Sequence, residues 1–393
     1  MSRSGAMVAA IFVLCACVQG MADEGILNLG PQEFVQAGGN DIVVPGYSVP
    51  SFEDWNNDGL RDLIVGEGGN NYTGKVRVYL NAGVESDPCF VDYFYAQADG
   101  VDLTCVPSGC QGCFPRVVYW DDDDRKDLMV GQSDGTVKIF LNITDNNEPA
   151  FDAGTLLRVR NDMLLNVGGR ATPTLVDWND DGHLDIIVGS LGGEIHIYEN
   201  CGCDGGWVPP RFLTSSPDGY PFARENGHDL IVPGKRSSPE FADLDGDGRK
   251  DLLVGTTGGL ILFYKNIGTP SLPEFAPYTS VQSMGTPIDL PDTLRSRPSL
   301  CHWTGDGKFG PKDGYWDLLV GYGDGKVRLY RGLPKAGDFD LDGTLDGDDF
   351  GFLAKALDKP VPAEGTPADL NGDGVVDTLD LRLFADLWLA ANK

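Results

Sequence analysis

The sequence has few basic side chains and very few histidines. It holds 30 Lys and Arg against 59 Asp and Glu, with only four His. The formal net charge of −29 argues against nucleic acid or an anionic membrane as a partner, since either would repel such a surface. No Gly-x-Ser-x-Gly, His-Glu-x-x-His or phosphate-binding glycine loop is present. We therefore assign no catalytic residue from the sequence.

Long apolar runs are also scarce. The one pronounced run extends from Ala6 to Val18, which is too short to anchor the chain across a bilayer. It lies between a basic residue and small residues that end at Ala22, as in an export signal that is cleaved there. The alternative takes "LCAC" as a lipidation motif, with Cys17 carrying the lipid. We predict a signal peptide at residues 1–22, no transmembrane segment after its cleavage, and a protein that is secreted or held at the cell surface.

Nine Cys are present, and removal of Cys15 and Cys17 with the signal leaves an odd number, seven. A group from Cys89 to Cys113 falls in one segment between repeats, and an exported setting favours local disulfides there. "CQGC" at Cys110 would alternatively supply half of a zinc site, although no second Cys-x-x-Cys or His pair accompanies it. The pairing does not follow from the sequence.

Gly, Pro and a recurring acidic motif are abundant. With 53 Gly and 25 Pro, the chain is rich in turns. The motif reads "DWNNDGLRDLIVG" at its first occurrence, and four variants follow at intervals of about 60 residues, which indicates a repeat architecture. The five copies begin at Asp54, Tyr119, Asp177, Asp243 and His302.

Each repeat is typical of four short strands. A strand that contains Pro leads into the acidic loop, "DLIVG" or its equivalent follows, and an alternating strand such as "GKVRVYLN" comes next. In that strand we expect Val76 and Val78 on one face and Lys75 and Arg77 on the other, as in a half-buried strand. A Pro-x-Phe element then supplies the fourth strand, which gives the size of a propeller blade.

The fifth repeat lacks a fourth strand, because "VRLYRG" leads directly into a different sequence at Asp338. "PQEF" at Pro31 precedes the first repeat and has no blade of its own. We predict that this N-terminal strand pairs into the last blade and closes the ring, since closure removes an exposed sheet edge. The expected fold class is an all-β propeller of five four-stranded blades, followed by a small α-helical domain.

Three of the acidic loops carry a complete set of cation ligands at alternate positions. Such a set of oxygens suits a hard cation, and outside the cell we expect calcium. A polar turn held by Asx hydrogen bonds is the alternative, but closely packed carboxylates would repel one another without a cation. The expected ligands are Asp54, Asn56, Asp58, the Leu60 carbonyl and Asp62; Asp177, Asn179, Asp181, His183 and Asp185; and Asp243, Asp245, Asp247, Arg249 and Asp251.

The other two loops are incomplete, and we expect weaker or no cation binding there. In the second copy Tyr119 replaces the first ligand and Asp124 replaces the glycine. In the fifth copy two ligands are replaced, and an insertion separates Asp306 from Asp317. The ligands that remain in the second copy are Asp121, Asp123 and Asp127.

The repeated pattern D-x-[DN]-x-D-G-x-x-D-[LI]-x-V-G, followed by G-x-[VI]-x-[VIL]-[YF]-x-N, resembles the FG-GAP/VCBS repeat. Propellers of this family are similar to the integrin alpha-subunit head, which usually has seven blades, so a count of five departs from that pattern. The resemblance covers residues 31 to 331, and we assign residues 23–332 to the propeller. It implies adhesion, carbohydrate binding or, in some relatives, polysaccharide cleavage.

Two further acidic loops, at Asp338 and Asp369, differ from the blade loops at their twelfth position. That position is an acid in both, whereas the complete blade loops have Val there. Apolar residues at three- and four-residue steps follow each loop and predict a helix. The expected ligands are Asp338, Asp340, Asp342, the Thr344 carbonyl, Asp346 and Asp349; and Asp369, Asn371, Asp373, the Val375 carbonyl, Asp377 and Asp380.

A duplicated unit of loop and following helix, with no helix before the loop, resembles a type I dockerin. We assign residues 338–393 to this domain and residues 333–337 to a linker. The resemblance implies calcium-dependent folding and docking onto a cohesin of a scaffold or cell-surface protein. The alternative is a small calcium-stabilised cap packed on the propeller.

Together these features favour an exported calcium-binding propeller that acts in adhesion or binds carbohydrate or protein, with a tail that docks to a cohesin-type or cell-surface partner. The second hypothesis is a polysaccharide lyase or glycoside hydrolase of an extracellular complex, which would need facing carboxylates. Aromatic side chains between strands could stack on sugars or fill the seams between blades. These are Trp207, Tyr220, Phe222 and Trp316.

Overall fold

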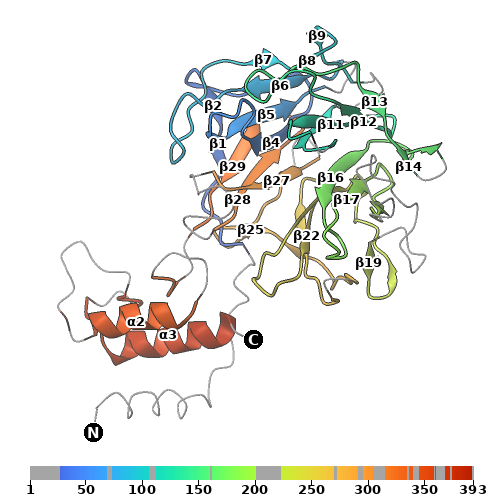
Figure 1. Ribbon diagram of the computed structural model, residues 1–393. Coiled ribbons are helices and arrows are strands. Elements are labelled where there is room, and N and C mark those ends of the chain that lie inside the picture. Colours follow the sequence, from blue (N-terminus) through green and yellow to red (C-terminus); the bar gives the residue numbers. More distant parts are fainter. Residues whose placement is uncertain are drawn as a thin grey trace. The chain divides into compact units, whose positions relative to one another are not determined.

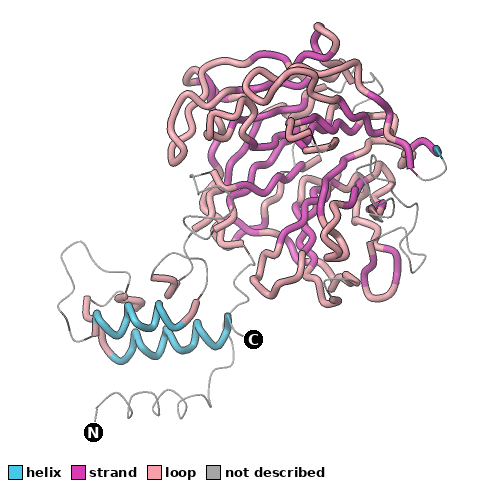
Figure 2. Tube along the Cα trace, viewed as in Figure 1, coloured by secondary structure: helices cyan, strands magenta, loops and turns pink. Residues whose placement is uncertain are grey.

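The chain forms two compact units, one with Leu29–Gly305 and Trp316–Gly332 and one that contains Leu333–Lys393. Strands make up the first unit and helices the second (Figures 1 and 2). The computed structural model describes residues 27–68, 73–105, 112–121, 123–159, 162–200, 223–269, 272–290, 295–303, 315–333, 336–339, 345–357, 359, 368–371 and 374–391.

Five antiparallel sheets of three or four described strands form the blades of the first unit, which confirms the predicted five-bladed propeller (Figure 1). The first strand of every blade contacts the first strands of two neighbouring blades, so that these inner strands make a closed ring. The inner strands are β4 (Val49–Glu53), β10 (Phe114–Val118), β16 (Thr172–Val176), β21 (Ser238–Ala242) and β27 (Arg297–Cys301).

Each inner strand pairs with a second strand, and the second with a third. The second strands are β5 (Asp62–Gly66), β11 (Asp127–Gly131), β17 (Asp185–Gly189), β22 (Asp251–Gly255) and β28 (Asp317–Gly321). The third strands are β6 (Val76–Tyr79), β12 (Val137–Phe140), β18 (Ile195–Tyr198), β23 (Ile261–Tyr264) and β29 (Val327–Tyr330). Two-residue fourth strands follow in three blades, namely β7 (Phe94–Tyr95), β13 (Thr155–Leu156) and β24 (Thr279–Ser280).

A short hairpin stands between the outer strand of one blade and the inner strand of the next. It lies on the connection that returns the chain from the outside of the propeller to its centre. The hairpins are β2 (Gln36–Ala37) with β3 (Asn40–Asp41), β8 (Gln97–Ala98) with β9 (Val101–Asp102), β14 (Arg158–Val159) with β15 (Met163–Leu164), β19 (Arg224–Glu225) with β20 (His228–Asp229), and β25 (Gln282–Ser283) with β26 (Thr286–Pro287).

The N-terminal strand closes the ring, as predicted. Strand β1 (Glu33–Phe34) pairs antiparallel with β29, with Glu33 opposite Leu329. The guanidinium of Arg331 forms an ion pair with Glu33 at 2.9 Å beside this pairing. The last blade therefore has four strands, and its third strand is covered on both edges.

The Pro-x-Phe elements at Pro88, Pro149 and Pro273 lie before the fourth strands rather than in them, and the one at Pro210 lies outside the described residues. Phe90 bridges Asn81 of its own blade, and Leu29 bridges Gly332 in the same way in the last blade. The counterpart of Phe90 is thus Leu29, and Phe34 of "PQEF" corresponds to the fourth strand itself. Phe90 and Leu29 are buried, because they anchor the outer strand before it reaches the exposed edge.

Strand β6 is buried on both faces, so the half-buried strand expected there from alternation was wrong. Val76 and Val78 are fully buried, and Arg77 on the opposite face is only 8 % exposed. Side chains of the same blade cover Arg77: its Nε donates to Glu67 at 2.5 Å, and its guanidinium lies over the ring of Tyr93. A buried polar face is stable here because the charge is paired.

One close contact joins every pair of neighbouring blades. A Cβ placed on Gly66 would lie 2.2 Å from the carbonyl oxygen of Cys113 and 2.6 Å from Cδ of Pro115 in the next blade, so no larger residue fits. This explains why Pro and Gly recur in each repeat. The five contacts are Gly66 with Pro115, Gly131 with Pro173, Gly189 with Pro239, Gly255 with Pro298, and Gly321 with Pro50.

The hydrophobic core lies between the blades, in clusters that draw residues from two neighbouring sheets. The second residue of most acidic loops is a buried Trp that belongs to these clusters. Trp303 of the last blade, for example, stacks on Phe52 of the first, with ring centroids 4.7 Å apart. The loops are thereby attached to the seams that hold the ring together.

The cysteine group between the first two blades forms a local disulfide, Cys105–Cys113. Cys113 is therefore not a zinc ligand in this structure. Of the other described cysteines, Cys89 is exposed and Cys301 is buried, and both are free thiols. Cys110, the other residue of "CQGC", lies outside the described residues, as do Cys201 and Cys203.

The second unit consists of two helices, each after an acidic loop, as predicted. They are α2 (Gly347–Ala356) and α3 (Thr378–Ala391), and they lie side by side (Figure 1). Leu353 of α2 and Phe384 of α3 are buried in one small core together with Phe339 and Val376. Neither these helices nor any other in the described part of the chain has the length and apolar character needed to cross a bilayer.

Candidate metal centres

The three complete blade loops share one turn geometry. In each, the first Asp accepts a hydrogen bond from the backbone N–H of the glycine at the sixth position. That glycine has a φ of 81° to 88°, in the left-handed region where other residues are strained. The pairs and their distances are Asp54 with Gly59 (3.1 Å), Asp177 with Gly182 (3.0 Å) and Asp243 with Gly248 (2.9 Å).

The side chains at the third and fifth ligand positions accept backbone hydrogen bonds within this turn. In the first loop Asn56 Oδ1 accepts from Asp58 N at 3.2 Å, and Asp58 Oδ1 accepts from Leu60 N at 2.8 Å. The third blade has the same two bonds, from Asp181 N to Asn179 and from His183 N to Asp181. The Asx hydrogen bonds and the spacing of the predicted cation ligands therefore occur in the same turn.

The fourth blade loop brings three carboxylates together. Oxygens of Asp243, Asp245 and Asp247 all lie within 4.8 Å of one another, a spacing that fits ligands around one calcium ion. The ammonium of Lys265 contacts Asp245 and lies 3.5 Å from Asp247. Hydrogen bonding to Asp245 raises the pKa of Lys265, so this lysine stays charged and competes with a cation for the same oxygens. Arg249 also pairs with Asp247, through its side chain.

Two loop oxygens lack hydrogen-bond donors, which fits a cation as partner. Oδ1 of Asp54 and Oδ1 of Asp121 are buried and have no hydrogen-bond partner among the described residues. The nearest cationic group to Asp54 Oδ1 is the ammonium of Lys126, at 3.5 Å. A buried carboxylate oxygen is costly unless it is paired or bound to a metal. The donor set of hard oxygens at both positions suits calcium.

The closing Asp of each blade loop has a structural role that the sequence did not indicate. Asp62 is fully buried and accepts the N–H of Trp55 at 2.8 Å and of Asn81 at 2.7 Å, so both oxygens tie the loop to two strands of the blade. Burial raises the pKa of Asp62 to about 6 despite these hydrogen bonds. Its part as a cation ligand stays a prediction. Asp127, Asp185, Asp251 and Asp317 make the same pair of hydrogen bonds.

The incomplete second loop keeps the shape of the others. Asp124 has a φ of 60° at the position where the complete loops have glycine, and Asp tolerates this region better than most residues. Asp123 Oδ1 accepts from Arg125 N at 2.9 Å, as at the same position elsewhere. Tyr119, which replaces the first ligand, is 60 % exposed. The second loop therefore keeps the turn of the complete loops and lacks only the ligand at its first position.

In the fifth loop, His302 packs on an aromatic ring. Its imidazole stacks on Trp316 with centroids 4.2 Å apart, so Trp316 is partly covered within the protein. Thr304 and Asp306 of this loop lie outside the described residues. The other aromatics considered for sugar stacking, Trp207, Tyr220 and Phe222, also lie outside them.

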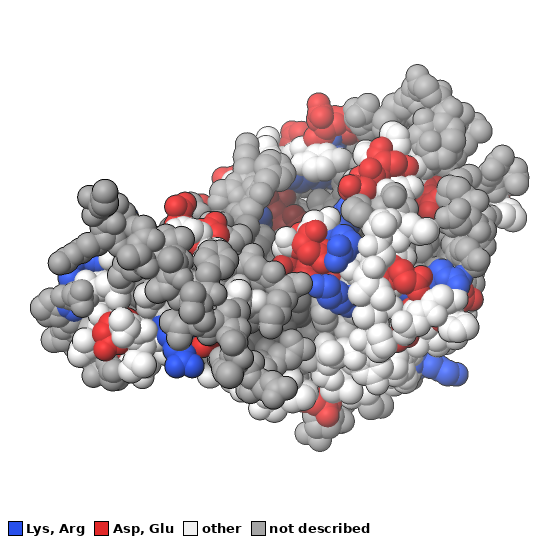
Figure 3. Space-filling view, turned by 90° about the horizontal axis from the view of Figure 1, so that it is seen from below, with Lys and Arg blue, Asp and Glu red and all other residues white. Residues whose placement is uncertain are grey.

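Basic side chains link three of the loops to the loop of the preceding blade, a feature that sequence reasoning missed. Nζ of Lys126 in the second blade contacts the Asp54 carbonyl of the first, and Nζ of Lys250 lies 3.2 Å from Asp180 of the third blade. Arg61 donates to the His302 carbonyl of the last blade at 3.2 Å. The sequence signal for these contacts is a basic residue directly before three of the closing Asp residues. Figure 3 shows acidic groups with basic side chains beside some of them.

The C-terminal loops are closed by acids within their helices. Asp349 Oδ1 accepts from Phe339 N at 2.6 Å and its Oδ2 from Asp346 N at 2.9 Å, while Asp346 caps α2. Asp380 accepts in the same way from Leu370 and Asp377. Both closing acids are fully buried. Of the predicted ligands here, Asp340, Asp342, Thr344 and Asp373 lie outside the described residues.

Two family models match parts of the chain. Residues 177–254 match the FG-GAP-like repeat family, and residues 336–385 match the dockerin type I domain. The chain thus joins an FG-GAP-like propeller to a type I dockerin domain. Type I dockerin domains typically bind calcium, and a dockerin implies a cohesin as its partner. No curated protein matches the chain.

Several solved structures resemble the propeller at low identity. A GH43_1 enzyme from Xanthomonas citri is 13% identical, with 75% of this chain and 90% of that chain covered and a TM-score of 0.43. The RS223-Beta-xylosidase is 13% identical, with coverage of 78% and 96% and a TM-score of 0.42. An oxidoreductase described as a glucose dehydrogenase, from Thermus thermophilus, is 15% identical, with coverage of 77% and 100% and a TM-score of 0.39. Similarity of this extent carries no information about activity or ligand.

Proposed function

We propose that this chain is an exported calcium-binding propeller that serves as a carbohydrate- or protein-binding module and is attached to a cohesin-bearing partner through its dockerin domain. The observation that carries the proposal is the pairing of two elements in one chain: the FG-GAP-like ring with clustered loop carboxylates, and the dockerin at residues 336–385. A dockerin needs no catalytic group in its own chain, because its task is attachment.

The calcium in the blades is proposed as structural. The loops stand between two strands of a blade, and their second residues lie in the seams between blades. A cation held by Asp243, Asp245 and Asp247 would fix the turn and neutralise three close carboxylates. This cation would stabilise the ring without contacting the carbohydrate or protein that the propeller binds.

The dockerin ligands are proposed at the positions that match the family motif. In the first loop the described ones are Asp338, Asp346 and Asp349, and in the second Asp369, Asn371, the Val375 carbonyl, Asp377 and Asp380. A cation at each loop would hold the N-terminus of the following helix, where negative groups are already favourable. Folding of the two helices would then depend on calcium.

Isothermal titration of the full chain with calcium tests the proposal. We expect binding at the three complete blade loops and the two C-terminal loops, and capture of an immobilised type I cohesin only when calcium is present. Asp369→Asn should abolish cohesin capture while the propeller loops still bind. Asp245→Asn should remove one blade site and leave cohesin capture intact.

A matched control is Asp92→Asn, which removes an exposed acid outside every loop. It should leave both calcium binding and cohesin capture unchanged. Failure of calcium to bind the full chain, or cohesin capture that ignores chelation, would overturn the proposal. Release of sugar products from a polysaccharide, lost on one acid-to-amide change in the propeller, would instead favour the enzyme.

A further inference from the structure

Four arginines lie together at one end of the ring of inner strands. Arg170, Arg236 and Arg295 each stand two residues before an inner strand, and Arg297 is the first residue of β27. Burial, followed by the positive charges of the other three, holds the pKa of Arg170 well below its usual range. The four guanidinium groups therefore share one environment although their blades are separate in sequence.

Two arginines of this cluster, Arg170 and Arg297, are buried with some of their donors unpaired. Arg170 is 1 % exposed and Arg297 is 2 % exposed, and charged side chains are seldom buried so deeply unless they are paired. Neither forms an ion pair with a carboxylate of the described residues. Nε of Arg170 and both Nε and Nη2 of Arg297 have no hydrogen-bond partner there. No described carboxylate compensates the positive charges of Arg170 and Arg297, so they favour an anion near the cluster.

Aromatic rings supply part of the compensation. The guanidinium carbon of Arg295 lies 4.3 Å and that of Arg297 4.9 Å from the ring centre of Tyr47, and Arg170 lies 4.9 Å from the ring of Phe114. Such contacts hold cations in place, but an aromatic ring does not remove the positive charge of the guanidinium. The rings orient the cluster rather than neutralise it.

The backbone at three of the arginines is strained in the same way. Arg170, Arg236 and Arg295 have φ values of 51°, 60° and 87°, in the left-handed region that is strained for a residue with a side chain of this kind. These residues occupy equivalent positions in three consecutive blades. A repeated strain that brings like charges together does not serve stability, and strain of this type gathers at functional sites.

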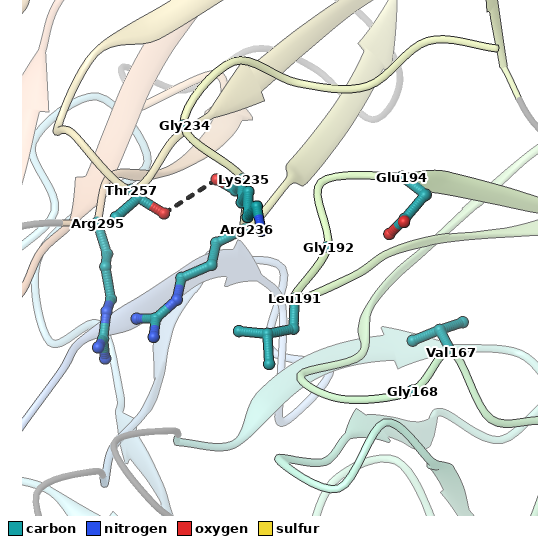
Figure 4. A pocket seen from close by; sticks show the side chains of 10 residues that line it. All are labelled: Val167, Gly168, Leu191, Gly192, Glu194, Gly234, Lys235, Arg236, Thr257 and Arg295. Atoms are coloured by element: carbon teal, nitrogen blue, oxygen red, sulfur yellow. Dashed lines mark hydrogen bonds between the residues drawn. The ribbon is translucent and has the colours of Figure 1, made fainter.

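A cavity of about 600 Å³ opens beside the cluster, and its size suits a sugar-sized ligand. In Figure 4 the side chains of Arg236 and Arg295 run side by side in one direction, while Glu194 and Val167 stand across the space, with Leu191 between. Glu194 accepts a hydrogen bond from Ser190, which helps to keep its pKa low. One wall thus offers cationic donors and the other an acceptor and apolar surface.

We propose that this site, the arginine mouth, binds the carboxylate of a uronate residue in an otherwise neutral glycan. In the arginine mouth Arg236 and Arg295 line the cavity, and the buried Arg170 and Arg297 add their positive charge behind them. The inference rests on the proposed function as a binding module and names its ligand class. Guanidinium forks match a carboxylate with parallel hydrogen bonds. Glu194 is placed to accept from a sugar hydroxyl on the opposite wall.

Isolated carboxylates are favoured over a dense polyanion. The chain carries a formal net charge of −29, so a polymer with a charge on every residue would be repelled outside the mouth. A single carboxylate flanked by neutral sugars meets only the local positive charge. The sequence signal for the site is Arg-x-x-Pro at the same phase in three repeats, in "RATP", "RSSP" and "RSRP".

Isothermal titration of the calcium-loaded full chain tests the proposal. The probes are a xylo-oligosaccharide that carries one glucuronate, the same oligosaccharide with that carboxyl reduced to the alcohol, polygalacturonate, and inorganic sulfate. We expect the uronate-bearing probe to bind at least tenfold more tightly than its reduced counterpart. Sulfate should compete with it weakly, and polygalacturonate should bind less tightly at low salt.

Variants locate the site. Arg236→Gln and Arg295→Gln should each weaken binding of the uronate probe about tenfold or more, and Arg236→Lys should recover only part of it because the fork is lost. Arg158→Gln, on a side chain that is 52 % exposed in a hairpin, is the matched control and should change nothing. The melting temperature without glycan should not fall in Arg295→Gln, because the change removes repulsion, whereas a structural arginine would lower it.

Equal binding of the intact and the reduced oligosaccharide would overturn the inference. So would no binding of the uronate probe, tighter binding of sulfate, or variants that bind normally. If the chain binds both oligosaccharides equally through another surface, the binding module stands and only the arginine mouth is wrong. If it binds no glycan and captures no cohesin, the proposed function fails as well.

Discussion

The blade loops and the C-terminal loops begin alike and end differently. Asp243 accepts from Gly248 N at 2.9 Å in a blade, and Asp369 accepts from Gly374 N at 2.9 Å in the dockerin. The blade loop is closed at its ninth position by Asp251, the first residue of a strand. The dockerin loop is closed at its twelfth by an acid in the first turn of a helix. The dockerin loop is thus three residues longer than the blade loop. It leads into a helix, whereas the blade loop leads into a strand.

The closing acids nevertheless share one structural role, because each accepts a backbone hydrogen bond from the start of its loop. Asp251 accepts from Leu244 N at 3.2 Å and Asp380 accepts from Leu370 N at 2.8 Å, each at the second residue of its loop. Their other oxygens differ, since Asp251 reaches Asn266 beyond the third strand whereas Asp380 reaches Asp377 in its own loop. The blade loop is therefore fixed by a sheet, and the dockerin loop mainly by itself. We expect the dockerin to depend more on its cation.

Calcium removal should have the largest effect and should separate the two loop types. With excess chelator, the C-terminal unit should lose most of its helical circular-dichroism signal, because its small core cannot hold close carboxylates together without the cation. The propeller should keep its strand signal and melt several degrees lower. An equal loss in both units, or none in either, would contradict the comparison.

Removal of a closing acid should come next. Asp251→Ala leaves two buried backbone N–H groups without an acceptor and should lower the free energy of unfolding of the propeller by about 2–5 kcal/mol. Asp380→Ala should affect only the helical unit, by a similar amount. Denaturant unfolding followed by strand and helix signals checks this, with Asp92→Asn as the control. A closing acid whose loss left stability unchanged would refute its clamping role.

Removal of the competing lysine should raise calcium affinity. Lys265→Met frees the carboxylates of Asp245 and Asp247, and the fourth blade loop should then bind calcium about threefold to tenfold more tightly. Titration against Lys138→Met, whose ammonium lies over the ring of Phe140, provides the comparison. An unchanged affinity would mean that the lysine moves away at no cost.

Repair of the second loop should have the smallest effect. The double change Tyr119→Asp and Asp124→Gly restores the first ligand and the glycine, and relieves a strained φ worth about 1 kcal/mol. One additional calcium should bind, which the stoichiometry of a titration would show. Asp124→Gly alone is the control, since it relieves strain without adding a ligand. No added site in the double variant would show that more than a ligand is missing.

The repeats made the fold predictable, because blade number and ring closure follow from local patterns that recur in register. Contacts between distant residues could not be inferred this way. Lys126 reaches Asp54, 72 residues away, and the second hydrogen bond of Asp62 comes from a residue 19 positions on. Alternation predicted that Arg77 lies on an exposed face, but it could not show that Glu67 and Tyr93 cover this side chain.

The arginine mouth illustrates the same limit. Its members are spread from Arg170 to Arg297, and no short segment holds more than two of them. Only the ring of inner strands brings them together, and only the left-handed backbone turns three of them to the same place. The candidate ligands of the loops, in contrast, are neighbours in sequence and could be predicted individually.

The borrowed strand β1 also gives the propeller a mechanical property. Tension transmitted through the dockerin enters the ring at β29, which is the last strand before the C-terminal unit. Without β1 that strand would form an edge and could unzip from β28 one hydrogen bond at a time. Because β1 pairs with its other side, and Arg328 and Gln32 make contact across 296 residues of chain, β29 is gripped from both sides. The strand that completes the ring therefore also makes β29 harder to pull out of its sheet when force acts through the C-terminal unit.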